Sequence, residues 1–147
     1  MNIELIKNLV DYGVIGLLGA MSFLAVMFWI ERLLFYRGVT PASYKTKEEL
    51  EIAVTNNINI ISTFGSNAPY IGLLGTVFGI IITFYSMGQS GDLDAKMIMT
   101  SLALALKATA MGLVVAIPSI VFYNHLVRKI EVILARWDIE QKQNDAD

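Results

Sequence analysis

The 147-residue sequence contains no cysteine and a single histidine, His125. Without thiols the chain has no disulfide framework, no thiolate metal site and no cysteine nucleophile. One histidine leaves little scope for metal binding or histidine-base chemistry, and no serine–histidine or metal-ligand constellation suggests a catalytic centre. We therefore expect no catalytic residues, no metal site and no cofactor.

Charge is also scarce. Charged residues make up 16% of the chain and hydrophobic residues 55%. An average soluble domain carries about 25% charged residues, so this chain lacks the polar surface of a soluble monomer. The 11 basic and 13 acidic residues nearly cancel, which excludes a nucleic-acid-binding protein held by bulk positive charge. The composition predicts a partner of another kind, the lipid bilayer.

Long uncharged stretches predict an all-α membrane protein with three transmembrane helices. The first stretch, residues 12–30, is nineteen residues long, close to the roughly 20 that cross a hydrocarbon core. The second span covers about 68–87 and the third about 97–124. Acidic residues precede the first stretch and Glu31 and Arg32 close it, so we interpret it as a retained anchor and not a cleaved signal. Residues 1–147 are predicted to form a single membrane domain.

Basic residues predict the orientation, because lysine and arginine near membrane helices are retained in the cytoplasm. Eight of the eleven lie between the first two spans or after the third, namely Arg32, Arg37, Lys45, Lys47, Arg128, Lys129, Arg136 and Lys142. We therefore expect residues 31–67 and 125–147 in the cytoplasm and residues 1–11 and 88–96 in the periplasm. The N-terminus is outside and the C-terminus inside.

The cytoplasmic segments are predicted to be long helical extensions of the spans. Residues 45–61 begin after serine and threonine and carry apolar residues at helical spacing, so this helix should continue into the second span. A single helix is expected from about Ala95 to Gln141. The run Gly-Gln-Ser-Gly-Asp at 88–92 should form a short turn.

Small residues follow one side of the second and third spans, as expected of helices that pack closely in lipid. The predicted packing residues are Gly72, Gly75 and Gly79 in the second span and Ala105, Gly112 and Ala116 in the third. Thr76 and Thr109 lie on the same faces, each within about a turn of the midplane of its span. Their hydroxyls either bond back to their own helices or form a polar band that lines an ion path or receives an ionisable group from a partner.

Two runs resemble a known family. They are APYIGLLGTVFG at 68–79 and ATAMGLVVAIP at 108–118, and Tyr123 and Asn124 follow the second. With these runs, three spans and the predicted orientation, the chain is similar to the MotA/TolQ/ExbB proton channel family and most similar to its ExbB members.

The resemblance implies a motor subunit in the inner membrane of a Gram-negative bacterium. Such subunits form a homopentamer around the membrane helices of an ExbD-like single-span partner, whose membrane aspartate carries the proton. The complex uses the proton motive force to energise a TonB-like protein for active transport across the outer membrane. The family's pore-lining threonines fall on Thr76 and Thr109.

The intramembrane charge departs from the family pattern. Many ExbB members have a glutamate five positions before the second threonine, where this chain has Leu104, and Lys107 follows three residues later. A lysine near the bilayer centre costs about 2.5–3.5 kcal/mol on insertion scales, and we expect no acidic residue of this chain at its depth. We predict that Lys107 lies at a helix or subunit interface, bonded to carbonyls, hydroxyls or a water-filled pocket. Direct proton carriage is the alternative.

Other functions share some of these features. A TolQ-like subunit of the envelope-maintenance system has the same membrane motifs. A stand-alone transporter of ions or small solutes usually needs its own intramembrane carboxylate or a broken helix, and a structural scaffold needs neither. Copurification with a single-span, aspartate-containing partner would separate the motor from the transporter and the scaffold.

Overall fold

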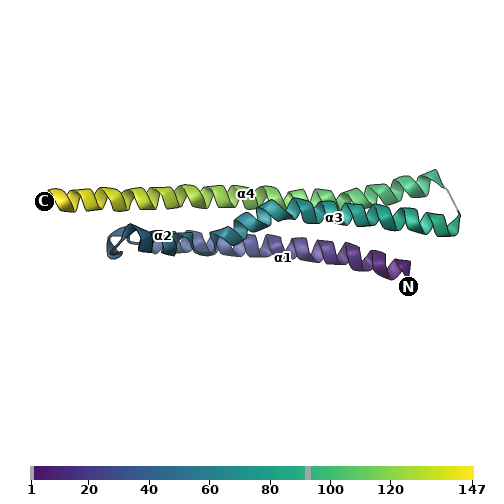
Figure 1. The fold of residues 1–147 in the computed structure, drawn as a ribbon, viewed down its shortest axis with the longest axis horizontal. Coiled ribbons are helices and arrows are strands. Elements are labelled where there is room, and N and C mark those ends of the chain that lie inside the picture. Colours follow the sequence, from purple (N-terminus) through teal and green to yellow (C-terminus); the bar gives the residue numbers. More distant parts are fainter. Residues whose placement is uncertain (1, 92–93) are drawn as a thin grey trace.

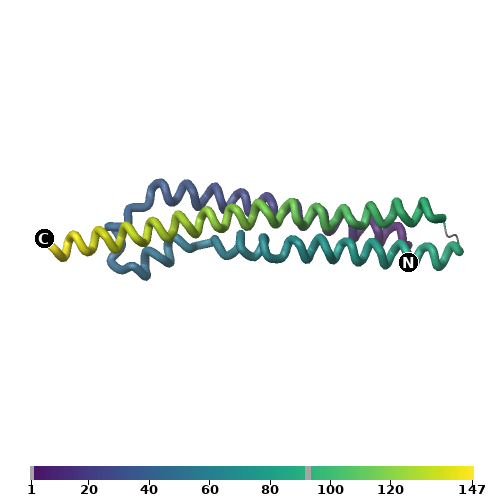
Figure 2. The backbone as a smooth tube through the Cα atoms, turned by 90° about the horizontal axis from the view of Figure 1, so that it is seen from above, coloured from purple at the N-terminus to yellow at the C-terminus, as the bar shows by residue number. Residues whose placement is uncertain are grey.

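The structure is a computed structural model that describes residues 2–91 and 94–147. Along the described chain lie helix α1 (Ile3–Gly38), the short 3-10 helix η1 (Pro41–Ser43), and helices α2 (Lys47–Thr55), α3 (Ile58–Ser90) and α4 (Ala95–Ala146). The long helices α1, α3 and α4 run side by side in alternating directions (Figures 1 and 2). The N-terminus lies toward the end where α3 turns back into α4, and the C-terminus lies at the other end (Figure 1).

The three long helices confirm the predicted all-α fold. Each of α1, α3 and α4 is long and apolar enough to cross a membrane, and a helix is suited to this because its backbone hydrogen bonds are satisfied within the segment. The single helix predicted from about Ala95 to Gln141 is also confirmed, and it extends to Ala146. α4 contacts every other helix of the described chain, so the other helices all pack against it.

The predicted continuous helix from residue 45 into the second span is wrong, because the chain breaks at Asn56 and Asn57. α2 ends at Thr55 and α3 begins at Ile58. Asn57 has a φ angle of 65°, in the left-handed region that asparagine tolerates better than most residues. The break separates two short apolar faces, which both pack against α4.

The predicted turn at 88–92 begins later than expected, because α3 continues to Ser90. Gly88, Gln89 and Ser90 are still helical, and Asp92 lies outside the described residues. Gly91 ends α3 with a φ angle of 68°, and its backbone N–H donates to the carbonyl of Met87 at 3.0 Å. Helices commonly end at a glycine in the left-handed conformation. α3 therefore continues until Gly91, which adopts that conformation.

An apolar core holds together the half of the bundle that includes α2 and the C-terminal half of α4. Its buried members are Leu50, Val54, Ile58, Ile61, Leu126, Ile130 and Ile133. They come from α2, the start of α3 and the second half of α4. The helix break at Asn57 therefore does not leave α2 loose, because its apolar face is fully used.

Two polar side chains of α1 fasten it to α2, beyond the predicted first span. The Tyr36 hydroxyl donates to the carbonyl of Val54 at 2.6 Å, and Arg32 Nη1 donates to the carbonyl of Ala53 at 3.1 Å. Arg32 is buried and also pairs with the neighbouring Glu31. Burial raises the pKa of Tyr36 to about 12, so its hydroxyl keeps the hydrogen that it donates. These contacts fix how α1 leaves the membrane-spanning part of the bundle.

Candidate functional site

The backbones of α3 and α4 approach each other closely at two glycines. A Cβ atom on Gly72 would lie 2.6 Å from the carbonyl oxygen of Ala108 and 3.0 Å from the Cα atom of Gly112. A Cβ atom on Gly112 would lie 2.6 Å from the carbonyl oxygen of Ala68. Contacts this short with backbone atoms leave no room for any side chain. Glycine at both positions therefore allows the two helix backbones to touch.

Small residues extend this contact along both helices. A Cβ atom on Gly75 would lie 2.9 Å from the Cβ of Ala108, and one on Gly79 would lie 2.8 Å from the Cβ of Ala105. Ala116 is 1% exposed and packs in a second buried cluster with residues of α1. All six residues singled out as small packing positions in the sequence thus lie at helix contacts.

Thr76 and Thr109 are brought together within this contact. Their Oγ1 atoms are 2.5 Å apart, and Thr76 Oγ1 donates to the carbonyl of Ala105 at 3.0 Å. A hydroxyl has one hydrogen. If Thr76 gives its hydrogen to Ala105, then Thr109 is the donor between the two threonines. The result is a short hydrogen-bonded chain that runs across the helix interface.

The two threonines differ in burial. Thr76 is 5% exposed, whereas Thr109 is half-buried. Thr76 also lies 3.4 Å from the carbonyl of Gly72 in its own helix, which is a weak contact beside the bond to α4. The hydroxyls therefore do more than bond back to their own helices, and Thr109 is the one nearer to the protomer surface.

Lys107 lines a cavity between α1 and α4 of about 290 Å³. Lys7, Asn8 and Asp11 of α1 line the same cavity, and so does Leu104, which stands at the glutamate position of many ExbB members. The expectation that this chain has no acidic residue at the depth of Lys107 is therefore wrong. Lys107 and Asp11 both border this cavity, but both residues are exposed, and no ion pair joins them in the described chain.

The reason for this difference is the offset of α1 along the bundle. Val14, one turn beyond Asp11, packs against Gly75, where its Cγ1 atom lies 3.1 Å from the position of an added Cβ. The first residues of the uncharged stretch 12–30 are thus level with the middle of the stretch 68–87. Charge counting along each span separately could not find Asp11, since it does not reveal how far one helix is displaced against another.

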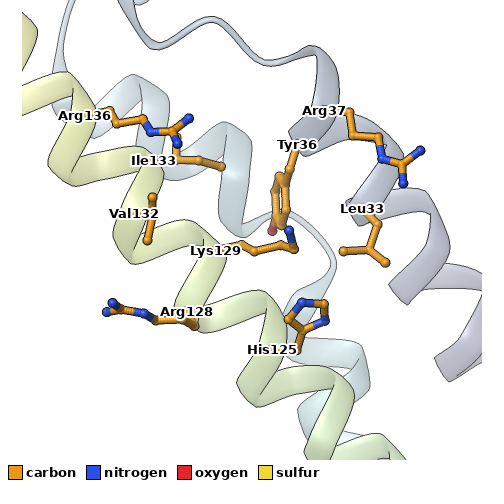
Figure 3. Close-up of a pocket in the computed structure, with 9 residues that line it drawn as sticks. All are labelled: Leu33, Tyr36, Arg37, His125, Arg128, Lys129, Val132, Ile133 and Arg136. Atoms are coloured by element: carbon orange, nitrogen blue, oxygen red, sulfur yellow. The ribbon is translucent and has the colours of Figure 1, made fainter.

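A second, larger pocket lies between the C-terminal halves of α1 and α4 and has a volume of about 510 Å³. Figure 3 shows the residues that line it: Leu33, Tyr36, Arg37, His125, Arg128, Lys129, Val132, Ile133 and Arg136. The arginines and lysine were counted in the sequence as orientation signals, and the pattern did not show that they line one space. No group of three or more potential metal-binding side chains occurs among the described residues.

Comparison with known proteins agrees with the three long apolar helices of the structure, because the family that matches is one of membrane channels. The model of the MotA/TolQ/ExbB proton channel family matches residues 26–139. The biopolymer transport protein ExbB of Aquifex aeolicus is 53% identical over 92% of this chain and 91% of its own length. ExbB of Helicobacter pylori strain J99 is 49% identical over 94% of this chain and 95% of its own length.

A TolQ protein is a more distant relative. The Tol-Pal system protein TolQ of Pseudomonas aeruginosa is 33% identical over 69% of this chain but only 42% of its own length. The family match includes α3, most of α4 and the Gly72–Gly112 and Thr76–Thr109 contacts. The chain is therefore a multi-pass membrane protein that belongs to the MotA/TolQ/ExbB proton channel family.

Proposed function

We propose that this chain is an ExbB-like motor subunit in the inner membrane of a Gram-negative bacterium. It forms a homopentamer around the membrane helices of an ExbD-like partner that carries a membrane aspartate. The complex uses the proton motive force to energise a TonB-like protein for active transport across the outer membrane. Support comes from the family match and from ExbB relatives that cover 92% and 94% of the chain. The number five and the partners rest on the resemblance.

The observation that carries the proposal is the Thr76–Thr109 hydrogen bond. A carboxyl group in an apolar lumen is costly to ionise unless polar groups stabilise the charge. With the Thr76 hydrogen on the Ala105 carbonyl, Thr109 is the donor between the two hydroxyls, and Thr109 is also the partly exposed one. Thr109 can turn its hydrogen toward a carboxylate of the partner when Thr76 turns its own hydrogen from Ala105 to Thr109, which keeps the bond between the two threonines. In this arrangement Thr109 lines the proton path and Thr76 is the residue that positions it.

Exposed apolar side chains support assembly with other chains. The protomer exposes large hydrophobic residues on α3 and α4, including Leu73, Leu74, Val77, Phe78, Leu104, Leu106 and Leu113. In a bilayer such residues contact lipid or other helices. A ring of copies with a partner helix pair inside gives the α3 and α4 faces protein neighbours on more than one side.

The proposal is tested by coexpression with ExbD-like and TonB-like proteins. The mass of the intact complex should correspond to five copies of this chain, and proton flux should be measurable in liposomes with a pH-sensitive dye. Thr109→Val removes a hydroxyl with almost no change in volume, so it should leave assembly intact and abolish flux. Thr83→Val is the matched control, because Thr83 bonds to the Gly79 carbonyl of its own helix at 2.8 Å. Full flux with both Thr76→Val and Thr109→Val would contradict the proposal.

A TolQ-like role is the alternative within the same family. The ExbB relatives match this chain over nearly their whole length, whereas the TolQ relative matches over 42% of its own. This difference favours the ExbB-like role. Complementation separates the two: the chain should restore outer-membrane transport in a strain without its ExbB-like subunit, and restoration of envelope integrity alone would favour the TolQ-like role.

A further inference from the structure

The pocket between the C-terminal halves of α1 and α4 is strongly basic. Its charged lining consists of Arg37 of α1 and Arg128, Lys129 and Arg136 of α4 (Figure 3). No carboxylate is among the described residues that line the space. Arg128 pairs with Glu131 at 3.3 Å, but the two side chains are 75% and 59% exposed, and such a pair contributes little. Among the described residues the other three basic side chains form no ion pair. The pocket therefore has a positive potential that attracts acidic groups.

The pocket also has hydrocarbon walls. Leu33 of α1 and Val132 of α4 line it, and both are only partly buried. Protein interfaces combine an apolar centre with a polar rim. An apolar side chain flanked by carboxylates would therefore match both kinds of surface in this pocket.

Helix α2 presents a surface of this composition. Glu48, Glu51 and Ile52 are exposed, and they share one helix face because they are three and four residues apart. Ile52 is 73% exposed. Neither glutamate forms an ion pair among the described residues. These three residues are called the acidic face of α2.

The acidic face of α2 is directed away from the pocket of its own chain. The opposite side of α2, with Leu50 and Val54, is buried in a core that also contains Ile133 of the pocket lining. The carbonyl of Val54 accepts the hydrogen bond from Tyr36, which is another lining residue. In Figure 3 the pale blue ribbon that includes α2 lies behind the labelled side chains. An acidic face of this kind can thus enter the pocket from a second copy of the chain.

The pocket and the acidic face lie at the same level along the bundle. Lys47, at the start of α2, pairs with Asp138 at 2.6 Å, and Val54, near the end of α2, shares a core cluster with Ile130. α2 therefore runs antiparallel to the part of α4 that lines the pocket, residues 125–136. Copies in a closed ring across a membrane are related by rotation about one axis, so none is shifted along it. The α2 helix of one copy is level with the pocket of its neighbour.

The levels of single residues also correspond. Counting along the antiparallel helices from the ion pair at the start of α2 puts Glu48 close to the level of Arg136. The same count puts Ile52 close to the level of Val132. Each step is about 1.5 Å on both helices, so the carboxylate and the isoleucine keep the spacing of the arginine and the valine.

We infer that the acidic face of α2 in one copy docks in the basic pocket of the next copy. Glu48 accepts charge-assisted hydrogen bonds from Arg136 of the neighbour, and Ile52 packs on Val132. Each copy uses its pocket toward one neighbour and its acidic face toward the other, which is the head-to-tail contact that closes a ring. The inference rests on the ring of copies in the proposed function, but not on their number or on other proteins.

Cysteine cross-linking tests the contact, because the native chain has no cysteine. The full-length chain with Ile52→Cys and Val132→Cys is coexpressed with ExbD-like and TonB-like proteins, and the membranes are oxidised with copper phenanthroline. A disulfide needs Cα atoms about 4.4–6.8 Å apart. A ladder of dimers and larger species should appear on a non-reducing gel, since each copy is bridged to the next.

Two controls accompany the cysteine pair. Each single cysteine variant should stay monomeric on the gel. Ile52→Cys with Glu131→Cys should give no ladder, because Glu131 is exposed next to Val132 in the chain but does not line the pocket. An equal ladder from this control pair would overturn the inference.

Charge reversal tests the ionic part of the contact. Glu48→Lys and Arg136→Glu should each raise the dissociation constant between copies roughly tenfold or more, and the chain with both changes should recover most of the loss. Glu49→Lys is the matched control, because it reverses an exposed charge in the same helical turn outside the acidic face. Mass photometry over a range of protein concentrations measures all four. No recovery in the double variant, or an equal loss in Glu49→Lys, would overturn the inference.

The outcomes separate this inference from the proposed function. An intact ring without the Ile52–Val132 cross-link would overturn the inference and leave the proposed function standing. A ladder without proton flux would support the inference and contradict the motor role. If no ladder forms and Arg37→Glu with Arg136→Glu releases an ExbD-like partner, the pocket belongs to an acidic segment of that partner and the inference is overturned.

Discussion

The Cα atom of Gly112 lies 3.0 Å from the position that a Cβ atom on Gly72 would occupy. The backbones of α3 and α4 thus meet where two glycines face each other, and the Thr76–Thr109 hydrogen bond lies next to this meeting point. The distance between the hydroxyls depends on the distance between the backbones. The glycines are therefore part of the geometry of the threonine site.

Gly72→Ala should destabilise the bundle by about 1–3 kcal/mol, the usual cost of forcing extra volume into a packed contact. The added Cβ would meet the Ala108 carbonyl oxygen at 2.6 Å, and a backbone atom cannot move aside cheaply. Gly19→Ala is the control, because nothing lies within 4 Å of its Cβ position. Thermal unfolding in detergent measures both, and equal stability of the two variants would refute the close contact.

Thr76→Val should cost more stability than Thr109→Val. The first change removes the bond to Ala105 as well as the bond to Thr109, and a net hydrogen bond contributes about 1 kcal/mol. The second change leaves the Thr76–Ala105 bond in place. Unfolding midpoints of the two variants in detergent check the order, and the reverse order would contradict the bond between Thr76 and Ala105.

Asp11 and Lys107 should be energetically coupled through the cavity that they share. Asp11→Asn and Lys107→Met should each weaken the fold slightly, and the double variant should lose less than the sum by about 0.2–1 kcal/mol, the usual coupling of exposed charges. Lys96→Met, outside that cavity, should show no coupling to Asp11→Asn. Strictly additive losses would exclude the pair.

The same lysine variant addresses function. If Lys107 acts in assembly or helix coupling, Lys107→Met should reduce the amount of intact complex with an ExbD-like partner. Loss of proton flux from a fully assembled complex would instead assign proton carriage to Lys107. Unchanged assembly together with unchanged flux would reject both roles.

Tyr36→Phe should destabilise the C-terminal end of α1 by about 1–2 kcal/mol, because the buried carbonyl of Val54 loses its donor. The raised pKa of Tyr36, about 12, also predicts a pH dependence. Its contribution to stability is fully present below pH 10, the ordinary tyrosine value, and is lost as the pH rises through 12. Stability measured from pH 9 to 12 should fall less steeply in Tyr36→Phe than in Tyr12→Phe, whose ring is exposed in the native chain.

The predicted orientation is open to labelling, because the native chain has no cysteine. Single cysteines in place of Lys45 and Asn144 should be protected from an impermeant thiol reagent added to intact spheroplasts. A cysteine in place of Gln89 should react. Labelling of the first two and protection of the third would reverse the orientation.

The sequence by itself determined the number and type of the helices. A run such as 12–30 is long and uncharged, and its fate in a bilayer depends on its own composition and not on contacts with other segments. The helix start at Asp94 and the stop at Gly91 follow equally from local chemistry, a side-chain cap on the Lys96 N–H and a left-handed glycine. The helix faces lined by small residues around Gly72 and Gly112 also follow from the spacing of those residues in the sequence.

The tertiary structure alone decided which of these faces meet and at what level. Asp11 is level with Lys107 because α1 is displaced along the bundle, and no spacing within one helix reveals a displacement between helices. Arg37 and Lys129 line one pocket because α1 and α4 present those sides to each other. The helix break at Asn57 was also decided by the tertiary structure. Asn57 takes a left-handed conformation because the apolar segments before and after it both pack on α4. Contacts between distant segments depend on the offset and rotation of whole helices, and these are settled only when all the faces are buried together.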